Sequence, residues 1–155
     1  MRRFLVILIA ALLCAGCAAT PEATPGSDAD AKRFESAVNA AIIYLYRPPV
    51  PGGRGASTIW VDGKLIGETL PTTYFRVAVR PGRNRITASG HDTGRLEIDT
   101  QADGVYFVEM QVLGETQGDS NTIFRSVAPD AGKAAILRCC SMLETWRPGQ
   151  SRFNF

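Results

Sequence analysis

His91 and Asp92 are the neighbouring residues whose types best suit acid–base chemistry. His91 is the single histidine of the chain, and a histidine beside a carboxylate is a typical general base of hydrolases. Such a base must be paired with a nucleophile, and no Gly-x-Ser-x-Gly segment marks one. A polar residue at a hairpin tip is the simpler interpretation of His91. We therefore name no catalytic residue and keep an envelope enzyme with a site near His91 and Asp92 as an alternative.

The four cysteines offer covalent, redox or metal chemistry. Cys139 and Cys140 are adjacent, and one histidine with two adjacent cysteines has no spacing typical of metal ligands. We expect no metal and no cofactor. The pair also lacks the Cys-x-x-Cys spacing of redox motifs, and a disulfide between sequence neighbours closes only a strained ring. A structural or free-thiol role is the expected one.

Cys17 lies where a covalent lipid would be attached. The chain begins with Met1, Arg2 and Arg3 and continues with an apolar run over residues 4–13, the pattern of a secretory signal too short to span a bilayer. Residues 13–17, Leu-Cys-Ala-Gly-Cys, resemble the lipobox of bacterial lipoproteins, although Cys14 occupies the position of the usual aliphatic residue. This resemblance implies a signal peptide over residues 1–16 and acylation of Cys17.

The residue after Cys17 bears on the destination of the protein. By resemblance to sorted lipoproteins of Gram-negative bacteria, Asp at this position would favour the inner membrane. Ala18 therefore indicates the periplasmic face of the outer membrane. Acyl chains hold a protein at a membrane almost permanently, since each buried methylene contributes about 0.8 kcal/mol.

Charge argues against nucleic acid as a partner. The whole chain has a formal charge of +2, and loss of Arg2 and Arg3 with the signal leaves 2 − 2, a value near zero. Phosphate binding needs a clear excess of Lys and Arg. One candidate basic surface remains, which would meet lipid phosphates or otherwise be a solvated strand face. Its residues are Arg76, Arg80, Arg83 and Arg85.

Tyr44, Tyr46 and Trp60 form a candidate ligand surface. Tyr44 and Tyr46 share one face of a predicted strand, and with Trp60 nearby they would make a platform for sugar rings or a peptide. The alternative is that the two tyrosines cover the second side of a central strand beneath a helix. The loop over residues 48–55 would serve as a binding rim or as a plain connection.

Composition divides the mature chain into three parts. Residues 17–33 contain the lipid attachment and a segment rich in Ala, Thr, Pro, Gly, Ser and Asp, for which we predict a flexible tether. Residues 34–147 are long enough for one domain. Residues 148–155 form a C-terminal tail.

The domain reads as short strands separated by turn signals. Strand-forming runs occupy residues 41–46, 58–61, 73–80, 84–88, 95–99, 105–112 and 122–127. Asp62-Gly63 predicts a two-residue type I′ hairpin, and Pro81-Gly82 predicts a second turn. Residues 129–138 are predicted to form a helix that begins at Pro129. The fold class is therefore mainly β: an antiparallel β-sandwich or partly open barrel of about seven or eight strands with one short C-terminal helix.

The order Ile43-Tyr44-Leu45-Tyr46-Arg47, Val61-Asp62-Gly63-Lys64, Thr73-Tyr74-Phe75 and Pro81-Gly82 resembles a family of bacterial lipoproteins catalogued as domain of unknown function 2846. The resemblance covers residues 41–137 and implies a small β-sandwich. It brings no catalytic residues.

Together these features predict a lipid-anchored, non-enzymatic binding or assembly domain of the cell envelope. The expected partners are the membrane itself, through the N-terminal lipid, and an envelope protein, a glycan or a lipid. The alternatives are the hydrolase-like enzyme described above and a purely structural envelope lipoprotein.

Overall fold

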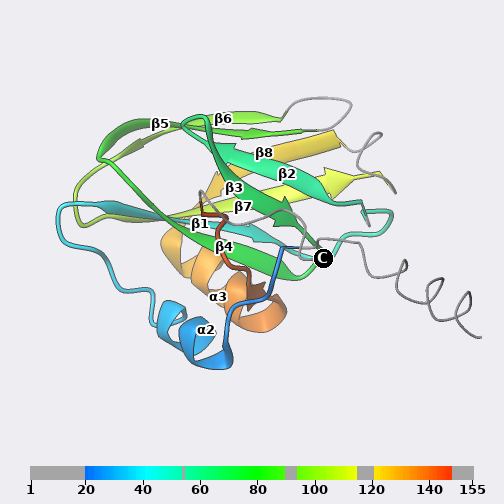
Figure 1. The fold of residues 1–155 in the computed structure, drawn as a ribbon, viewed down its shortest axis with the longest axis horizontal. Helices are drawn as coiled ribbons and strands as arrows, with labels where there is room; N and C mark the ends of the chain where they lie inside the picture. The colour runs from blue at the N-terminus through cyan, green and yellow to red at the C-terminus, as the bar shows by residue number, and fades with distance from the viewer. Residues whose placement is uncertain (1–19, 54, 90–93, 115–120, 148–155) are drawn as a thin grey trace, which may run out of the picture.

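The computed structural model describes residues 20–53, 55–89, 94–114 and 121–147. They form two stacked β-sheets with two helices beneath one of them (Figure 1). The predicted β-sandwich is confirmed, with nine strands in the described part of the chain.

The first sheet lies in the middle layer and has the order β8-β7-β1-β4-β9. Its strands are β1 (Ala41–Arg47), β4 (Thr73–Val79), β7 (Val105–Leu113), β8 (Asn121–Val127) and the short β9 (Ser141–Met142). Strand β1 pairs antiparallel with β4 but parallel with β7, and β9 pairs parallel with β4. The sheet is therefore mixed rather than purely antiparallel. The long connection that a parallel pair needs consists here of the four strands of the second sheet together with β4.

The second sheet has the order β3-β2-β5-β6, and all its pairs are antiparallel. Its strands are β2 (Ser57–Val61), β3 (Lys64–Thr69), β5 (Gly82–Ala88) and β6 (Arg95–Thr100). The predicted hairpin joins β2 to β3. Asp62 and Gly63 have φ angles of 50° and 75°, as a type I′ turn requires.

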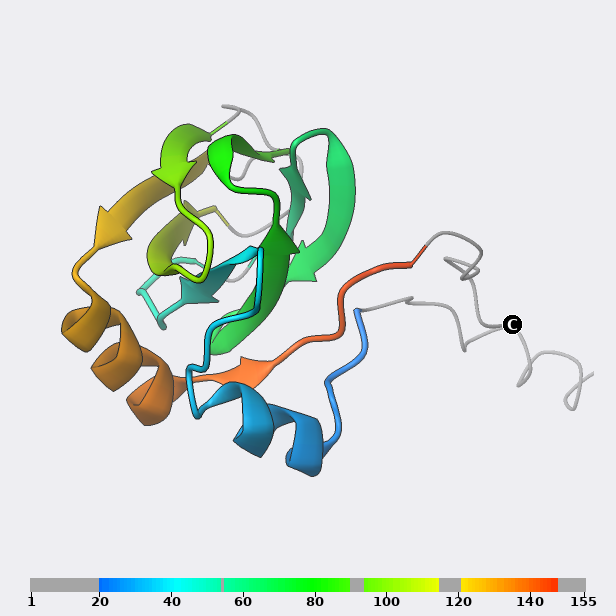
Figure 2. The same cartoon turned by 90° about the vertical axis from the view of Figure 1, so that its left-hand side faces the viewer.

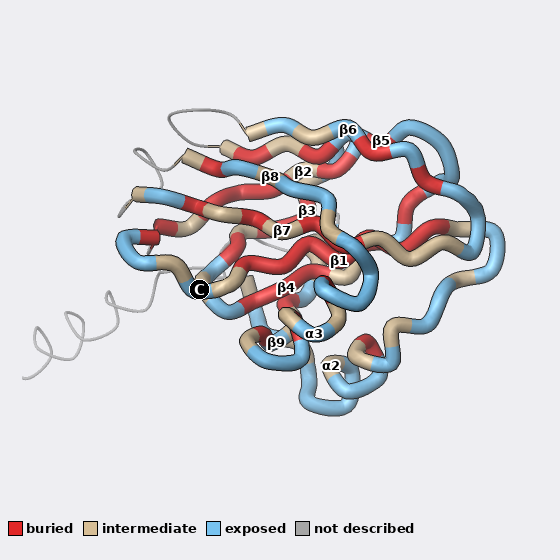
Figure 3. Tube along the Cα trace, turned by 180° about the vertical axis from the view of Figure 1, so that it is seen from behind, coloured by how far each residue is buried: buried red, intermediate tan, exposed pale blue. Residues whose placement is uncertain are grey.

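The main core lies between the two sheets. Alternate residues of β4, namely Phe75, Val77 and Val79, point into it and are at most 8% exposed, which confirms their predicted shared face. They pack against inward residues of β1, β2, β5, β7 and the other strands of the sandwich. Figure 3 shows the buried positions concentrated along β1 and its neighbours.

A second apolar cluster lies on the opposite face of the first sheet, beneath helices α2 (Pro25–Ala31) and α3 (Pro129–Cys139). This is why β1 is buried along its entire length: both of its faces are covered. Helix α3 begins at Pro129 as predicted and approaches β7 closely at Gly132, where an added Cβ would overlap Phe107.

Helix α2 contradicts the predicted flexible tether over residues 17–33 in the part that the structure describes, residues 20–33. Thr24 caps the helix by accepting a hydrogen bond from the amide of Ser27, and Pro25 begins it. Residues 20–23 then pair with the C-terminal segment: Glu22 bridges Leu143, and the amide of Glu144 donates to Pro21. Figure 2 shows the two ends of the described chain running side by side.

Candidate functional site

Asp28 is the residue that fastens α2 to the domain. Its Oδ1 accepts hydrogen bonds from the hydroxyl of Tyr74 and from the amide of Met142, both at 2.9 Å. Its Oδ2 accepts from Lys32 Nζ at 2.7 Å. Burial alone would raise the pKa of Asp28, but these hydrogen bonds from Lys32, Tyr74 and Met142 together lower it. The ionised carboxylate therefore joins α2, β4 and β9.

Tyr44 makes the second attachment and belongs to an aromatic cluster under the helices. Its hydroxyl donates to the carbonyl of Ala31 at 2.6 Å, at the end of α2. Its ring stacks on Phe107 and meets the edge of Phe34, with both centroid distances 5.2 Å. Burial raises the pKa of Tyr44 and, to above the ordinary range, that of Tyr74. These tyrosines are structural donors.

The predicted aromatic platform is wrong. Tyr44 and Tyr46 are 0% and 2% exposed, so their ring faces cannot stack on a ligand. Trp60 lies on β2 in the other sheet, opposite Leu65 and Thr87, where it is half-buried. Burial of the tyrosines beneath the helices, the alternative interpretation, is what the structure has.

Tyr46 is tied to the neighbouring strand. Its hydroxyl donates to Glu109 Oε2 at 3.0 Å, and Glu109 also pairs with Arg125 of β8. Burial, with the hydrogen bond to Glu109, raises the pKa of Tyr46 to about 12.

A groove of about 450 Å³ lies between α2 and the C-terminal segment. One wall is α2 and the residues that follow it, including Ser27, Asp30 and Arg33. The other wall is the paired ribbon of Ala23 with residues 142–145 and 147. Among the cavities that the described residues form, this groove is our candidate binding site, because it is open, polar and bounded by chain segments that the fold holds in place.

Arg76 of β4 lies in this groove. Its Nε donates to the hydroxyl of Tyr44 at 3.3 Å and its Nη2 to the carbonyl of Glu35 at 3.4 Å. Both acceptors are neutral groups. Arg33, on the wall, is by contrast within ion-pair distance of Asp30 and Glu35, each at 3.2 Å. Arg76 is therefore held by neutral acceptors, whereas Arg33 lies between two carboxylates.

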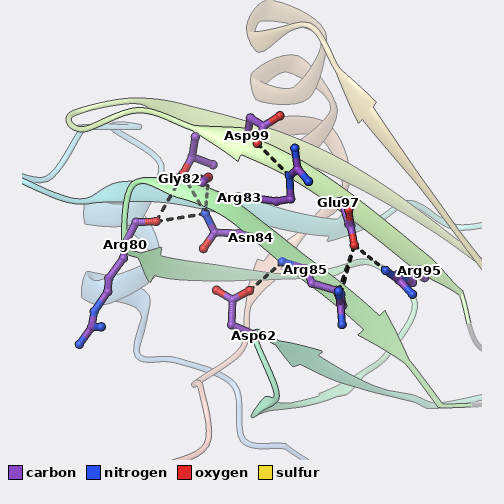
Figure 4. Close-up of polar contacts among 10 residues, drawn as sticks. Asp62, Arg80, Gly82, Arg83, Asn84, Arg85, Arg95, Glu97 and Asp99 are labelled. Atoms are coloured by element: carbon purple, nitrogen blue, oxygen red, sulfur yellow. Dashed lines mark hydrogen bonds and ion pairs between the residues drawn. The ribbon is translucent and has the colours of Figure 1, made fainter.

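The expected basic patch of four arginines does not form. Arg76 lies beneath α2, whereas Arg83 and Arg85 lie on the outer face of the second sheet, beside β6 (Figure 4). There Arg83 pairs with Asp99 at 3.5 Å and Arg85 with Glu97 at 3.2 Å. Hydrogen bonds from Arg95 and from Arg85 lower the pKa of Glu97. This surface is a mixed, solvated strand face.

Arg80 is separate from that ladder of ion pairs. Its carbonyl accepts a hydrogen bond from Asn84 Nδ2 at 3.1 Å, and the amide of Asn84 also bonds Gly82 and Thr100. The exposed side chain of Arg80 extends away from these residues (Figure 4). Arg80 therefore contributes through its backbone to the turn that carries the chain from β4 to β5.

Arg47 is fully buried and closes one end of the sandwich. Its guanidinium donates to the carbonyls of Gly53 and Thr69 and to the Thr69 hydroxyl, while Nε has no partner. Burial lowers its pKa to about 10, so the side chain is a cation at neutral pH. Gly53 also bridges Gly114 at the end of β7. The loop predicted as a possible rim is thus held to the sandwich at Gly53.

Cys139 and Cys140 are joined in a disulfide at the end of α3. Cys140 is buried in the helix-side cluster, and β9 begins at the next residue. The sulfur atoms are therefore part of the packing between α3 and β9.

Several predicted residues lie outside the described residues. These are Cys17 with the whole signal segment, His91 with Asp92, and the tail over residues 148–155. In the part of the chain that is described, no helix has the length and apolar character needed to cross a bilayer. The same residues contain no cluster of three or more potential metal ligands.

Sequence reasoning missed Asp28, Arg47 and Tyr74. A capping signal for α2 was present, since Thr24-Pro25 is followed by Asp28 in the first turn. Arg47 ends an apolar strand, where a charge is conspicuous. No local pattern shows that Tyr74 reaches Asp28, because 46 residues separate them.

Two comparisons place the chain among known sequences. The family model described as protein of unknown function (DUF2846) matches residues 37–123. A protein of Haemophilus influenzae described as uncharacterized is 30% identical over 135 residues, which cover 85% of this chain and 79% of that protein.

Proposed function

Since the chain belongs to the DUF2846 family of proteins of unknown function, we propose that it is a lipid-anchored lipoprotein of the cell envelope with a non-enzymatic binding domain. Acylated Cys17 holds it at the outer membrane, on the periplasmic side. The groove beside α2 is its binding surface for an envelope protein, a glycan or a lipid.

One observation carries this proposal: the described fold reaches back to Thr20, three residues after Cys17. The Thr20 hydroxyl accepts from the amide of Glu68 at 2.8 Å, so the fold is fastened to its first described residue. A lipid on Cys17 would thereby hold the whole domain at the membrane surface, and the groove wall containing Ala23 would be only a few residues further along the chain.

The roles of the titratable groups between α2 and the first sheet favour binding over catalysis. Asp28, Tyr44 and Tyr74 each direct their polar atoms to α2 or to groups that hold it. Catalytic acids and bases have to present those atoms to a substrate. The groove is instead lined by residues suited to polar recognition.

The anchor is tested by fractionation of cells that express Cys17→Ser, with Cys14→Ser as the matched control. We expect Cys17→Ser in the soluble periplasmic fraction and Cys14→Ser in the membrane fraction. Retention of Cys17→Ser in membranes after a high-salt wash would contradict the anchor.

The binding role is tested separately. A photo-crosslinking residue at Ser36, in the groove, should give a defined adduct in intact cells, whereas one at Ser126, on β8, should give none. Catalytic turnover by the purified protein, without any adduct at Ser36, would contradict the proposal.

A further inference from the structure

We infer that the face formed by residues 20–23 and 142–147 lies against the lipid headgroups of the membrane that holds Cys17. This inference rests on the proposed lipid anchor and adds an orientation to it. The partner is the headgroup layer of that same bilayer.

The length of chain available decides the orientation. Three peptide steps connect Cys17 to Thr20, and at about 3.3–3.6 Å of extended reach per step they span at most about 11 Å. A domain of this length has a radius of gyration of roughly 14 Å and is therefore about 36 Å across. A link this short cannot reach around the domain, so Thr20 has to be on the side facing the bilayer.

The region around Thr20 is rigidly joined to the C-terminal segment. Glu22 bridges Leu143, the amide of Ala23 donates to Met142, and that of Glu144 donates to Pro21. The amide of Trp146 in turn donates to Ile66 on β3. Constraining Thr20 at the headgroups thus constrains this entire ribbon.

Charge does not explain the contact. Glu22 and Glu144 are exposed on the ribbon, and Arg147 follows them. Acidic and basic groups occur together, so the face has no excess of positive charge to draw it to anionic lipid. The orientation comes from the short link and is therefore insensitive to salt.

The groove borders this face, since the ribbon is one of its walls. Its opening is consequently held near the headgroup layer rather than out in the periplasm. A ligand of the groove has to be reachable there.

The test uses the full lipidated protein with a nitroxide-sensitive fluorophore on an introduced cysteine. Glu144→Cys places the label on the ribbon beside β9. Ser126→Cys places it on exposed β8, at the opposite edge of the five-stranded sheet and about 19 Å away at about 4.8 Å per strand spacing. The native cysteines do not compete for label, because Cys139 and Cys140 are bonded to each other and Cys17 is acylated.

The labelled proteins are placed in vesicles of phosphatidylethanolamine and phosphatidylglycerol that contain nitroxide-headgroup lipid. We expect strong quenching at position 144, little at position 126, and the same contrast at high salt. Inserting twelve Gly and Ser residues between Ala19 and Thr20 gives an extended reach of about 50 Å and should abolish the contrast.

A failure of the orientation is distinguishable from a failure of the anchor. Equal quenching at both positions in protein that sediments with vesicles overturns the orientation but leaves the anchor intact. A contrast that survives the insertion also overturns it, because the link would then not be its cause. Protein that does not sediment with vesicles refutes the lipid anchor itself.

Discussion

Replacing Asp28 by Ala should detach α2 from the domain. The substitution removes the acceptor of the Tyr74 hydroxyl and of the Met142 amide, and it removes the partner of Lys32. Tyr74 and Met142 belong to the first sheet, on β4 and β9 beneath α2, so their donors lose a protein partner where water reaches poorly.

The magnitude follows from these contacts. A hydrogen bond to a charged acceptor contributes about 1.5 kcal/mol or more, and two such bonds give about 3 kcal/mol. The Lys32 pair is partly exposed and adds about 0.5 kcal/mol. Ala has a better helix propensity than Asp, which offsets about 0.5 kcal/mol. The net loss in the free energy of unfolding is therefore about 3 kcal/mol.

Asp30→Ala is the matched control. Asp30 is in the same helix, but its side chain is 69% exposed and pairs only with exposed Arg33. The loss of this pair and the gain in helix propensity should cancel to within about 0.5 kcal/mol.

Urea unfolding and hydrogen exchange measure the effect in the soluble Cys17→Ser chain. If α2 unfolds with the whole domain, Asp28→Ala lowers the urea midpoint by roughly 1.5 M. If α2 opens locally, the amides of Lys32 and Met142 exchange about a hundredfold faster while those of β7 are unchanged. Asp28→Ala behaving like Asp30→Ala in both assays would refute the reasoning.

The same contact has a pH signature. The pKa of Asp28 is lower in the folded chain than its ordinary value of 3.8. Its stabilisation is therefore fully present above pH 3.8 and is lost as the pH falls through the folded pKa. Wild-type protein should lose more stability than Asp28→Ala over this acidic range.

Three further predictions concern the body of the fold. Gly132→Ala should lower the free energy of unfolding by about 1–3 kcal/mol, because the added Cβ overlaps Phe107. The control is Gly26→Ala in α2, whose added Cβ meets no atom within 4 Å and which should raise the free energy of unfolding by about 0.5 kcal/mol. Equal effects of the two substitutions in calorimetry would contradict this packing. Arg47→Lys should lower the free energy of unfolding, measured with urea, by about 2 kcal/mol. An ammonium group cannot donate to the carbonyls of both Gly53 and Thr69 as the guanidinium does. An unchanged free energy of unfolding would refute that role of Arg47. Between pH 10 and about 12, the free energy of unfolding of the wild-type protein should fall by roughly 3 kcal/mol more than that of Tyr46→Phe. The reason is that the pKa of Tyr46 is raised to about 12 in the folded chain, so its stabilisation disappears as the unfolded chain ionises. Parallel curves of stability against pH for the two proteins would contradict this prediction.

The strands and turns could be predicted because their signals are local. The run over residues 73–80 alternates as β4 does, and Asp62-Gly63 takes the positive φ angles expected of it. Strand order was not predictable from such signals. The parallel pairing of β1 with β7 joins residues about 60 apart, and no turn residue specifies that arrangement.

The predicted tether shows a limit of compositional reasoning. Residues 20–33 have few large apolar side chains, yet α2 is ordered by hydrogen bonds to buried tyrosines rather than by its own apolar surface. Buried hydroxyls need partners, and the backbone of α2 supplies one to Tyr44. The same fact bears on the failed platform, since Tyr44 is covered by α2, an element that the sequence did not reveal.

The arginine surface failed for a different reason. Arg76 and Arg83 are close in sequence, but Pro81-Gly82 carries the chain from one sheet to the other. Residues on either side of that turn therefore face different surroundings. Pairing of Arg83 with Asp99 also depends on the register between β5 and β6, and part of the connection between these strands lies outside the described residues.

The pairing of the two chain ends has a consequence for the order of assembly. Asp28 bonds Met142 across 114 residues, so α2 has no complete docking site until β9 is in place. Because β9 pairs with β4, the first sheet has to form before that. Helix α2, which precedes every described strand in the chain, is thus among the last elements to be fixed. A chain truncated before Met142 should retain the inner strands while leaving its N-terminal helix unattached.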